Sequence, residues 1–169
     1  MENILRARTL AADRWRKLED GELLTSTGDV LVPLPRWLSE RSDLRDRRGR
    51  IGLWLEPGDD PGAIAAARDE VGLIAVHFPR VTDGRGYSIA RLLRERCGYR
   101  GELRAVGDVQ RDQLFYLMRC GFDSFALNSR AEAAAAVAAF DDFSEAYQAS
   151  VERPVPLFRR RHNEAGGVA

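Results

Sequence analysis

The stretch "GLIAVHFPRVTDGRGYSIARLLRERCGYRGELRAVG", from Gly72 to Gly107, decides the fold. It opens with an apolar run, turns through a loop with two glycines, continues as a helical pattern and ends in a second apolar run. In the helical part, Ile89, Leu93 and Cys97 fall on one stripe, as a period of 3.6 residues requires. Strand, helix and strand in this order predict a βα unit of a parallel sheet.

The same alternation continues on both sides of this stretch. The short apolar runs are Ile51 to Glu56, Gly72 to Phe78, Gly101 to Gly107 and Phe122 to Leu127. The helical patterns are Ala63 to Glu70, Ser88 to Cys97, Val109 to Cys120 and Arg130 to Tyr147. We therefore expect an α/β fold of about four βα units with a parallel sheet, either open or half of a (βα)₈ barrel. The short, even units favour the half-TIM-barrel-like arrangement.

The ends of the expected helices carry recognisable signals. Ser129 with Glu132 three residues later predicts a capping box, and Asp108 is placed to cap the helix that follows it. Glycine between two apolar residues indicates a helix C-terminus. Such triplets occur at Val71-Gly72-Leu73, Cys97-Gly98-Tyr99 and Cys120-Gly121-Phe122.

The flanking regions complete the expected organisation. "LLTSTGDVLVPL", from Leu23 to Leu34, predicts a short N-terminal β-hairpin around a Thr-Gly-Asp turn. We expect residues 1–157 to form a single α/β domain and residues 158–169 to be a flexible C-terminal tail. A half barrel has a bare sheet edge, which predicts a homo-oligomer or a protecting partner.

Charge and hydropathy exclude several classes of protein. The 26 basic and 26 acidic residues cancel, which argues against a binder of nucleic acid or of anionic membranes. Lys17 is the only lysine, a skew that GC-rich coding explains. The alanine-rich run Ala133 to Phe140 is too short to span a bilayer, and the N-terminus lacks the pattern of a secretory signal. We expect a cytoplasmic protein.

Cysteine and tryptophan offer no strong functional signal. Cys97 and Cys120 form no CxxC motif and no Cys/His cluster, so the sequence predicts neither a disulfide framework nor a metal site. Their place at helix ends favours packing over redox chemistry. The three tryptophans, Trp15, Trp37 and Trp54, are interpreted as core or interface residues.

A parallel sheet of this kind binds ligands beyond the carboxyl ends of its strands. That rule selects Glu56, His77, Asp108 and Asn128 as candidates. We predict His77 and Asp108 as catalytic candidates, since an imidazole can act as acid or base near neutral pH and a carboxylate can assist it. The alternatives are a hydrogen-bonded core histidine and a helix-capping aspartate.

The loop "PRVTDGRGYS" leads into a helix N-terminus, where backbone N–H groups and arginines favour anions. We predict here a site for sulfate, sulfite, phosphate or a carboxylate. The alternative is that the glycines shape a turn, Asp83 or Ser88 caps the helix, and the arginines are solvated. "GRG" is neither a GxGxxG fingerprint nor a phosphate loop. The candidate residues are Arg80, Asp83, Gly84, Arg85, Gly86, Tyr87, Ser88 and Arg91.

The run from Asp83 to Phe125 resembles a bacterial family, domain-of-unknown-function family 934, most specifically in "DGRGYS", "GELRAVGDV" and "RCGFD". The likeness extends from about Leu24 to the "RPVPLFRRR" end. Members of the family are described as oxidoreductases of sulfite reduction, and the resemblance implies a role beside a sulfite or nitrite reductase in sulfate assimilation. It brings no established catalytic residues.

Three functions remain open at this point. The first is an accessory protein of assimilatory sulfite reduction that holds an oxyanion or a sulfite reductase subunit. The second is an enzyme, an oxidoreductase by its family description, that uses His77 as acid or base on an anionic substrate. The third is a structural protein whose basic "LFRRR" end docks a partner. The cofactor is unknown, because the chain has no dinucleotide fingerprint, iron–sulfur ligand set or haem-attachment motif.

Overall fold

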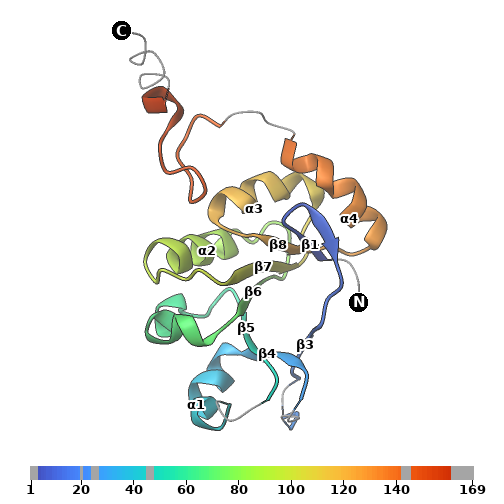
Figure 1. The fold of residues 1–169 in the computed structure, drawn as a ribbon, viewed down its shortest axis with the longest axis vertical. Coiled ribbons are helices and arrows are strands. Elements are labelled where there is room, and N and C mark those ends of the chain that lie inside the picture. Colours follow the sequence, from blue (N-terminus) through green and yellow to red (C-terminus); the bar gives the residue numbers. More distant parts are fainter. Residues whose placement is uncertain (1–3, 20, 24–26, 45–47, 142–145, 161–169) are drawn as a thin grey trace.

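The computed structural model describes residues 4–19, 21–23, 27–44, 48–141 and 146–160. It shows a mixed α/β fold with an eight-stranded, curled half-barrel sheet in the order β2-β1-β8-β7-β6-β5-β4-β3 (Figure 1). The strands are β1 (Ile4–Arg6), β2 (Thr9–Ala11), β3 (Trp15–Lys17), β4 (Asp29–Pro33), β5 (Ile51–Leu55), β6 (Leu73–Phe78), β7 (Glu102–Gly107) and β8 (Ser124–Ala126).

Within the described residues the strands from β3 to β8 are parallel and adjacent in chain order, so the parallel part has six strands, where four were predicted. The α/β half-barrel character is confirmed. The connections pass through α1 (Leu34–Leu44), the 3₁₀ helix η1 (Pro61–Glu70), α2 (Arg85–Glu95), and η2 (Arg111–Gln113) with α3 (Leu114–Cys120). After β8 come α4 (Arg130–Ala136) and η3 (Val137–Asp141).

The predicted hairpin at Leu23–Leu34 is wrong in position. Its second strand is β4, which pairs in parallel with both β3 and β5. Val30, Leu31 and Val32 are all buried, and burial on both faces suits an interior strand of a parallel sheet better than a hairpin arm. The N-terminal hairpin is formed instead by β1 and β2, while residues 24–26 lie outside the described part.

A short connection forces the sheet to curl. β2 lies at one edge of the sheet and β3 at the other, yet only Ala12–Arg14 joins them. Four Cα steps reach about 14 Å, whereas eight flat strands would place their edges about 33 Å apart. We call residues 12–14 the strap. Figure 1 shows the N-terminal segment running from β1, beside β8, to β3, beside β4.

The two faces of the sheet have different surroundings. The helices cover one face and build the main core with it. On the other, inner face, Leu31, Leu73, Ala75 and Val106 are buried, while Trp15, Trp54 and Ala126 are partly exposed. The inner face is therefore where the protein combines apolar surface with access from solvent.

The predicted helix-end signals are confirmed in part. Gly98 and Gly121 adopt the left-handed conformation, with φ of 67° and 109°. The Ser129 side chain accepts a hydrogen bond from the N–H of Glu132, as in the first half of a capping box. Gly72 follows a 3₁₀ helix and has no positive φ, so the triplet Val71-Gly72-Leu73 does not mark the same kind of end.

The C-terminal predictions are tested only partly. Residues 161–169 of the expected tail lie outside the described residues, as do residues 142–145 of the last expected helix. In the described part that helix ends at Ala136 and continues as η3. Among the described helices none combines the length and hydropathy needed to cross a bilayer.

Candidate functional site

The carboxyl ends of β5 and β6 bring His77 beside Glu56. Leu55 pairs with Val76 in the parallel register, so the next residues along the two strands are neighbours. His77 Nδ1 lies 2.7 Å from Glu56 Oε2. The other carboxylate oxygen accepts a hydrogen bond of 2.7 Å from Trp54 Nε1. Because both oxygens are held, the carboxylate has a fixed orientation toward the imidazole.

A lysine completes this group of side chains. Lys17 Nζ lies 4.3 Å from the centroid of the Trp54 ring, and the His77 ring lies 5.1 Å from the same tryptophan. Lys17 makes no ion pair with any described residue. We call Lys17, Trp54, Glu56 and His77 the rim cluster.

The electrostatics of the rim cluster keep Glu56 ionised. Partial burial by itself raises the pKa of the Glu56 carboxyl, but hydrogen bonds from His77 and Trp54 and the nearby charge of Lys17 outweigh it, so that the pKa lies below its usual value. An ionised Glu56 favours the proton on Nδ1 of His77. Nε2, which has no hydrogen-bond partner among the described residues, is then able to accept a proton or bind a ligand.

A pocket of about 380 Å³ opens on the inner face next to the rim cluster. We call its end at the carboxyl ends of β3, β7 and β8 the mouth, the end with the buried ion pair the floor, and the apolar lining between them the wall. His77 pairs with Val106 across β6 and β7 and so borders the pocket. The lining includes Trp15, Leu31, Trp54, Val106 and Ala126 on the wall, Asp13 and Arg104 at the floor, and Lys17, Gly107 and Asn128 at the mouth.

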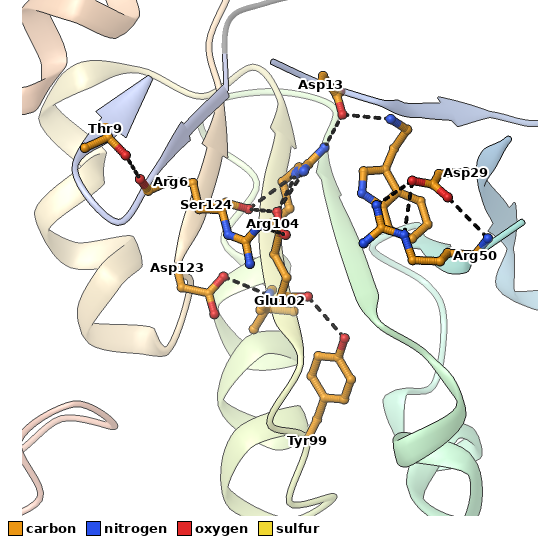
Figure 2. A network of polar contacts seen from close by, with 12 residues as sticks. Arg6, Thr9, Asp13, Asp29, Arg50, Tyr99, Glu102, Arg104, Asp123 and Ser124 are labelled. Atoms are coloured by element: carbon orange, nitrogen blue, oxygen red, sulfur yellow. Dashed lines mark hydrogen bonds and ion pairs between the residues drawn. The ribbon is translucent and has the colours of Figure 1, made fainter. Parts of the chain in front are cut away.

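The floor of the pocket is a buried ion network (Figure 2). The Arg104 side chain is only 5% exposed and lies 2.7 Å from Glu102 and 2.8 Å from Asp13. Ser124 Oγ donates a hydrogen bond of 2.8 Å to Glu102 and accepts one from Arg104 Nε. Arg6 adds a second cation 3.2 Å from Glu102. Two arginines and two acids cancel, so the network is neutral as a whole.

The same network fixes the strap. Asp13 Oδ1 accepts hydrogen bonds from Arg104 Nη1, at 2.8 Å, and from the backbone N–H of Trp15, at 3.0 Å. Figure 2 shows Asp13 pointing from the strap toward Arg104 on the sheet. The strap is therefore tied across the inner face, and it turns an open sheet surface into a pocket.

The structure gives most residues of the "DGRGYS" loop local roles. Arg85 Nη2 pairs with Asp83 Oδ2 at 2.7 Å, and Arg91 pairs with Glu95 at 2.9 Å. Two of the three predicted anion-binding arginines, Arg85 and Arg91, are therefore neutralised by neighbours on their own segment. Gly84 is at the N-cap position of α2, while Arg80 and Ser88 are exposed.

Two aromatic residues explain the rest of the loop. A Cβ on the buried Gly86 would lie 2.4 Å from Cζ of Phe78, so only glycine lets α2 pack on this ring. Tyr87 packs on the same ring at 5.4 Å, and its hydroxyl accepts a hydrogen bond from Gln113. The loop is thus shaped by packing between β6, α2 and η2.

Asp83 gives a testable pH dependence. The hydrogen bonds from Arg85 lower the pKa of Asp83 from 3.8 to about 2. A carboxyl with a depressed pKa in the folded state stabilises the fold above its unfolded pKa and loses that contribution as pH falls through the folded value. We expect the stability difference between the wild type and Asp83→Asn to shrink between pH 4 and pH 2. Urea unfolding at several pH values measures it, and a difference that is constant over this range would contradict the pairing.

The sequence predicts that Asp108 caps the helix that follows it. This prediction is wrong, because the N-cap residue of that helix is Gln110. The Asp108 carboxylate instead accepts a hydrogen bond of 2.8 Å from the N–H of Val81. It therefore holds the loop that precedes α2. The two catalytic candidates have different partners: His77 contacts Glu56 in the rim cluster, and Asp108 contacts the loop.

Both cysteine thiols are buried, Cys97 at 6% and Cys120 at 3% exposure. Burial raises the pKa of each thiol, which disfavours the reactive thiolate. In the described part of the chain, no three His, Cys, Asp or Glu side chains are grouped closely enough to hold a metal ion.

The C-terminal "LFRRR" segment is described only as far as Arg160. Phe158 is 51% exposed and its ring lies 6.5 Å from that of Tyr147, which is also exposed. Arg159 lies over the Phe158 ring. This aromatic pair is apolar surface that a docking partner could cover, as the third function requires.

Sequence reasoning missed much of the inner-face site. The sequence indicates Trp15 and Trp54 only as core or interface residues, and no motif singles out Lys17. A signal for the floor network was nevertheless present, since Glu102 and Arg104 alternate with apolar residues inside a predicted strand, which places them together on one face.

The comparisons with known proteins concern most of the chain. Residues 52–158 match the family described as "Bacterial protein of unknown function (DUF934)". The match includes Trp54, Glu56, His77 and Asp108 and leaves out β1 to β4, with Trp15 and Lys17. No curated protein matches the chain.

Proposed function

We propose, for a chain that belongs to the bacterial family of unknown function DUF934, a role as an accessory protein of assimilatory sulfite reduction that holds a small oxyanion. The sulfite association is what the family resemblance implies. The proposal that the anion binds at the mouth of the inner-face pocket is supported by the lysine that lines it, Lys17. The "DGRGYS" loop is less suitable, because the charges of Arg85 and Arg91 are already paired.

One observation carries the choice of place. Lys17 and His77 both contact Trp54 at the pocket mouth, and Lys17 has no carboxylate partner among the described residues. A lysine that makes no ion pair with a described residue, next to a histidine that becomes a second cation when protonated, favours an oxyanion. Glu56 opposes this attraction, yet with His77 protonated the rim cluster has one net positive charge.

Titration with sulfite and sulfate tests the binding site. We expect Lys17→Met to weaken binding about tenfold, the loss of one charge-assisted contact. Arg85→Met should change the affinity less than twofold, because that guanidinium is already paired with Asp83. Arg68→Met, on the outer surface of η1, controls for net charge. Isothermal titration calorimetry measures all four proteins, and equal affinity for the wild type and Lys17→Met would contradict this site.

The pathway assignment needs a separate test. Affinity purification from the native host should recover a sulfite or nitrite reductase subunit with the wild-type protein. A second bait, truncated after residue 156, separates docking through the "LFRRR" segment from docking elsewhere. If neither bait recovers any sulfur-assimilation protein, the accessory role fails even where sulfite binding stands.

An enzymatic role is the second candidate, because Glu56 orients the imidazole of His77 and leaves Nε2 available. A histidine held by a carboxylate in this way is a common acid–base arrangement. Under this reading, turnover of an anionic substrate falls at least a hundredfold in His77→Gln while the fold is retained. Unchanged turnover in that variant removes the enzymatic reading.

A further inference from the structure

We infer that the inner-face pocket binds an aromatic ring that bears an anionic group, such as an aryl sulfonate or an aryl carboxylate. The inference deepens the proposed function and rests on it only for the binding of the anionic group of the ligand. The binding of the aromatic ring is inferred from the shape and composition of the pocket.

The wall of the pocket suits a flat apolar group. Trp15, Leu31, Trp54, Val106 and Ala126 line it and supply aromatic and aliphatic surface. Aromatic rings stack on or meet each other edge to face with a gain beyond the area buried. The volume of about 380 Å³ lies within the usual range for small-molecule sites.

A glycine allows this wall to be flat. A Cβ at Gly52 would lie 2.8 Å from Cδ2 of Leu31 and 3.0 Å from Cζ3 of Trp15. Because β5 has no side chain there, Trp15 and Leu31 lie directly against the sheet and leave space above them. Arg50 lies 5.2 Å from the centroid of the Trp15 ring and so helps to fix it.

The charges give the ligand its direction. The floor contains Arg104, Arg6, Glu102 and Asp13, which neutralise one another. A neutral, paired floor offers no net attraction to an anion. Lys17, which makes no ion pair with any described residue, is at the mouth. The ring therefore enters first, and the anionic group stays beside Lys17 and His77.

The strap favours a small molecule over a protein partner. Asp13 is tied to Arg104 across the inner face, so the partly exposed rings of Trp15 and Trp54 lie within a pocket. A second copy of the chain or a partner strand would have to displace the strap and break this ion pair. A six-membered aromatic ring can enter the pocket without displacing the strap.

Tryptophan fluorescence gives a direct readout. Trp15 and Trp54 line the pocket, whereas Trp37 is 2% exposed in the core on the helix side and provides a constant background. Three probes separate the contributions: sulfate has the anion alone, benzyl alcohol the ring alone, and benzenesulfonate both. We expect benzenesulfonate to quench the fluorescence and to bind at least tenfold more tightly than sulfate.

Variants locate the ring. Ala126→Phe places a ring in the partly exposed wall position and should weaken benzenesulfonate binding at least tenfold with sulfate binding unchanged. Trp15→Leu is the second ring-site variant, for use if Ala126→Phe fails to unfold cooperatively. Lys17→Met should weaken both anions, and Arg68→Met neither.

The outcomes separate this inference from the proposed function. Sulfate binding with no gain from the ring overturns the inference and leaves the oxyanion site standing. Benzenesulfonate and benzyl alcohol binding without sulfate binding overturns the oxyanion site and leaves the ring site. A dimer in solution that shields Trp15 and Trp54 from benzenesulfonate overturns the inference as well.

Discussion

Replacing Arg104 with leucine is expected to lower the free energy of unfolding by about 3–5 kcal/mol. The Arg104 and Glu102 side chains are 5% and 7% exposed, so leucine leaves a buried carboxylate with one partner fewer. The strap also loses its tie through Asp13. Breaking a buried ion pair from one side costs more than the pair contributes, because the remaining charge is desolvated without compensation.

Urea denaturation measures this effect against a matched control. Arg16 pairs with Glu22 at 2.6 Å, but their side chains are 49% and 33% exposed. Arg16→Leu should therefore cost less than about 1 kcal/mol. Adding Glu102→Leu to Arg104→Leu should recover part of the loss, since it removes the orphaned charge. Similar small losses in Arg104→Leu and Arg16→Leu would show that the network is not buried as described.

Replacing Gly107 with alanine is expected to cost about 3 kcal/mol or more, the sum of backbone strain and a steric clash. Gly107 has a φ of 96°, and a Cβ there would lie 2.3 Å from the backbone oxygen of Phe78 and 2.7 Å from Cδ2 of His77. Neither of these atoms can move without cost, because the Phe78 oxygen belongs to the backbone of the adjacent strand and the His77 side chain belongs to the rim cluster.

Gly28 separates the two causes. Its φ is 86°, yet a Cβ there meets nothing within 4 Å. Gly28→Ala should therefore show the strain alone, about 1 kcal/mol. Thermal and urea unfolding compare the two variants, and equal losses would mean that the strands are not as close at Gly107 as described. A folded Gly107→Ala should also have altered chemical shifts at His77.

The parallel strands from β5 to β8 could be predicted because their signals are local. Each apolar run and each helical stripe lies within a dozen residues, and the capping serine is three residues from its partner. β3 is a three-residue strand with two basic residues, so no pattern marks it. β4 has a turn signal before it that also suits a hairpin, and its parallel pairing depends on strands distant in sequence.

Two residues of the candidate site could be singled out from the sequence, but the pocket beside them could not. The rule for parallel sheets selected Glu56 and His77 as residues near the ends of two strands, and in the structure these strands are neighbours and the two side chains lie 2.7 Å apart. Which arginines are neutralised depends on side-chain geometry, as the Asp83–Arg85 pair shows. The pocket depends on the curl of the sheet and on the strap, which join residues about 90 positions apart, such as Asp13 and Arg104.

The expected homo-oligomer remains a prediction. β3 is an edge strand of only three residues, and it lies beside the pocket wall. Short edge strands are one of the ways in which proteins limit edge-to-edge pairing. Size-exclusion chromatography with light scattering would determine the oligomeric state.

A crystal structure of the protein with benzenesulfonate tests the central claim, that the inner face of the half barrel is a ligand pocket with a cationic mouth. The account predicts the ring against Trp15 and Trp54 and the sulfonate within ion-pair distance of Lys17. A structure in which the inner face is covered by a second copy, or in which the ligand binds only at the "DGRGYS" loop, would contradict it.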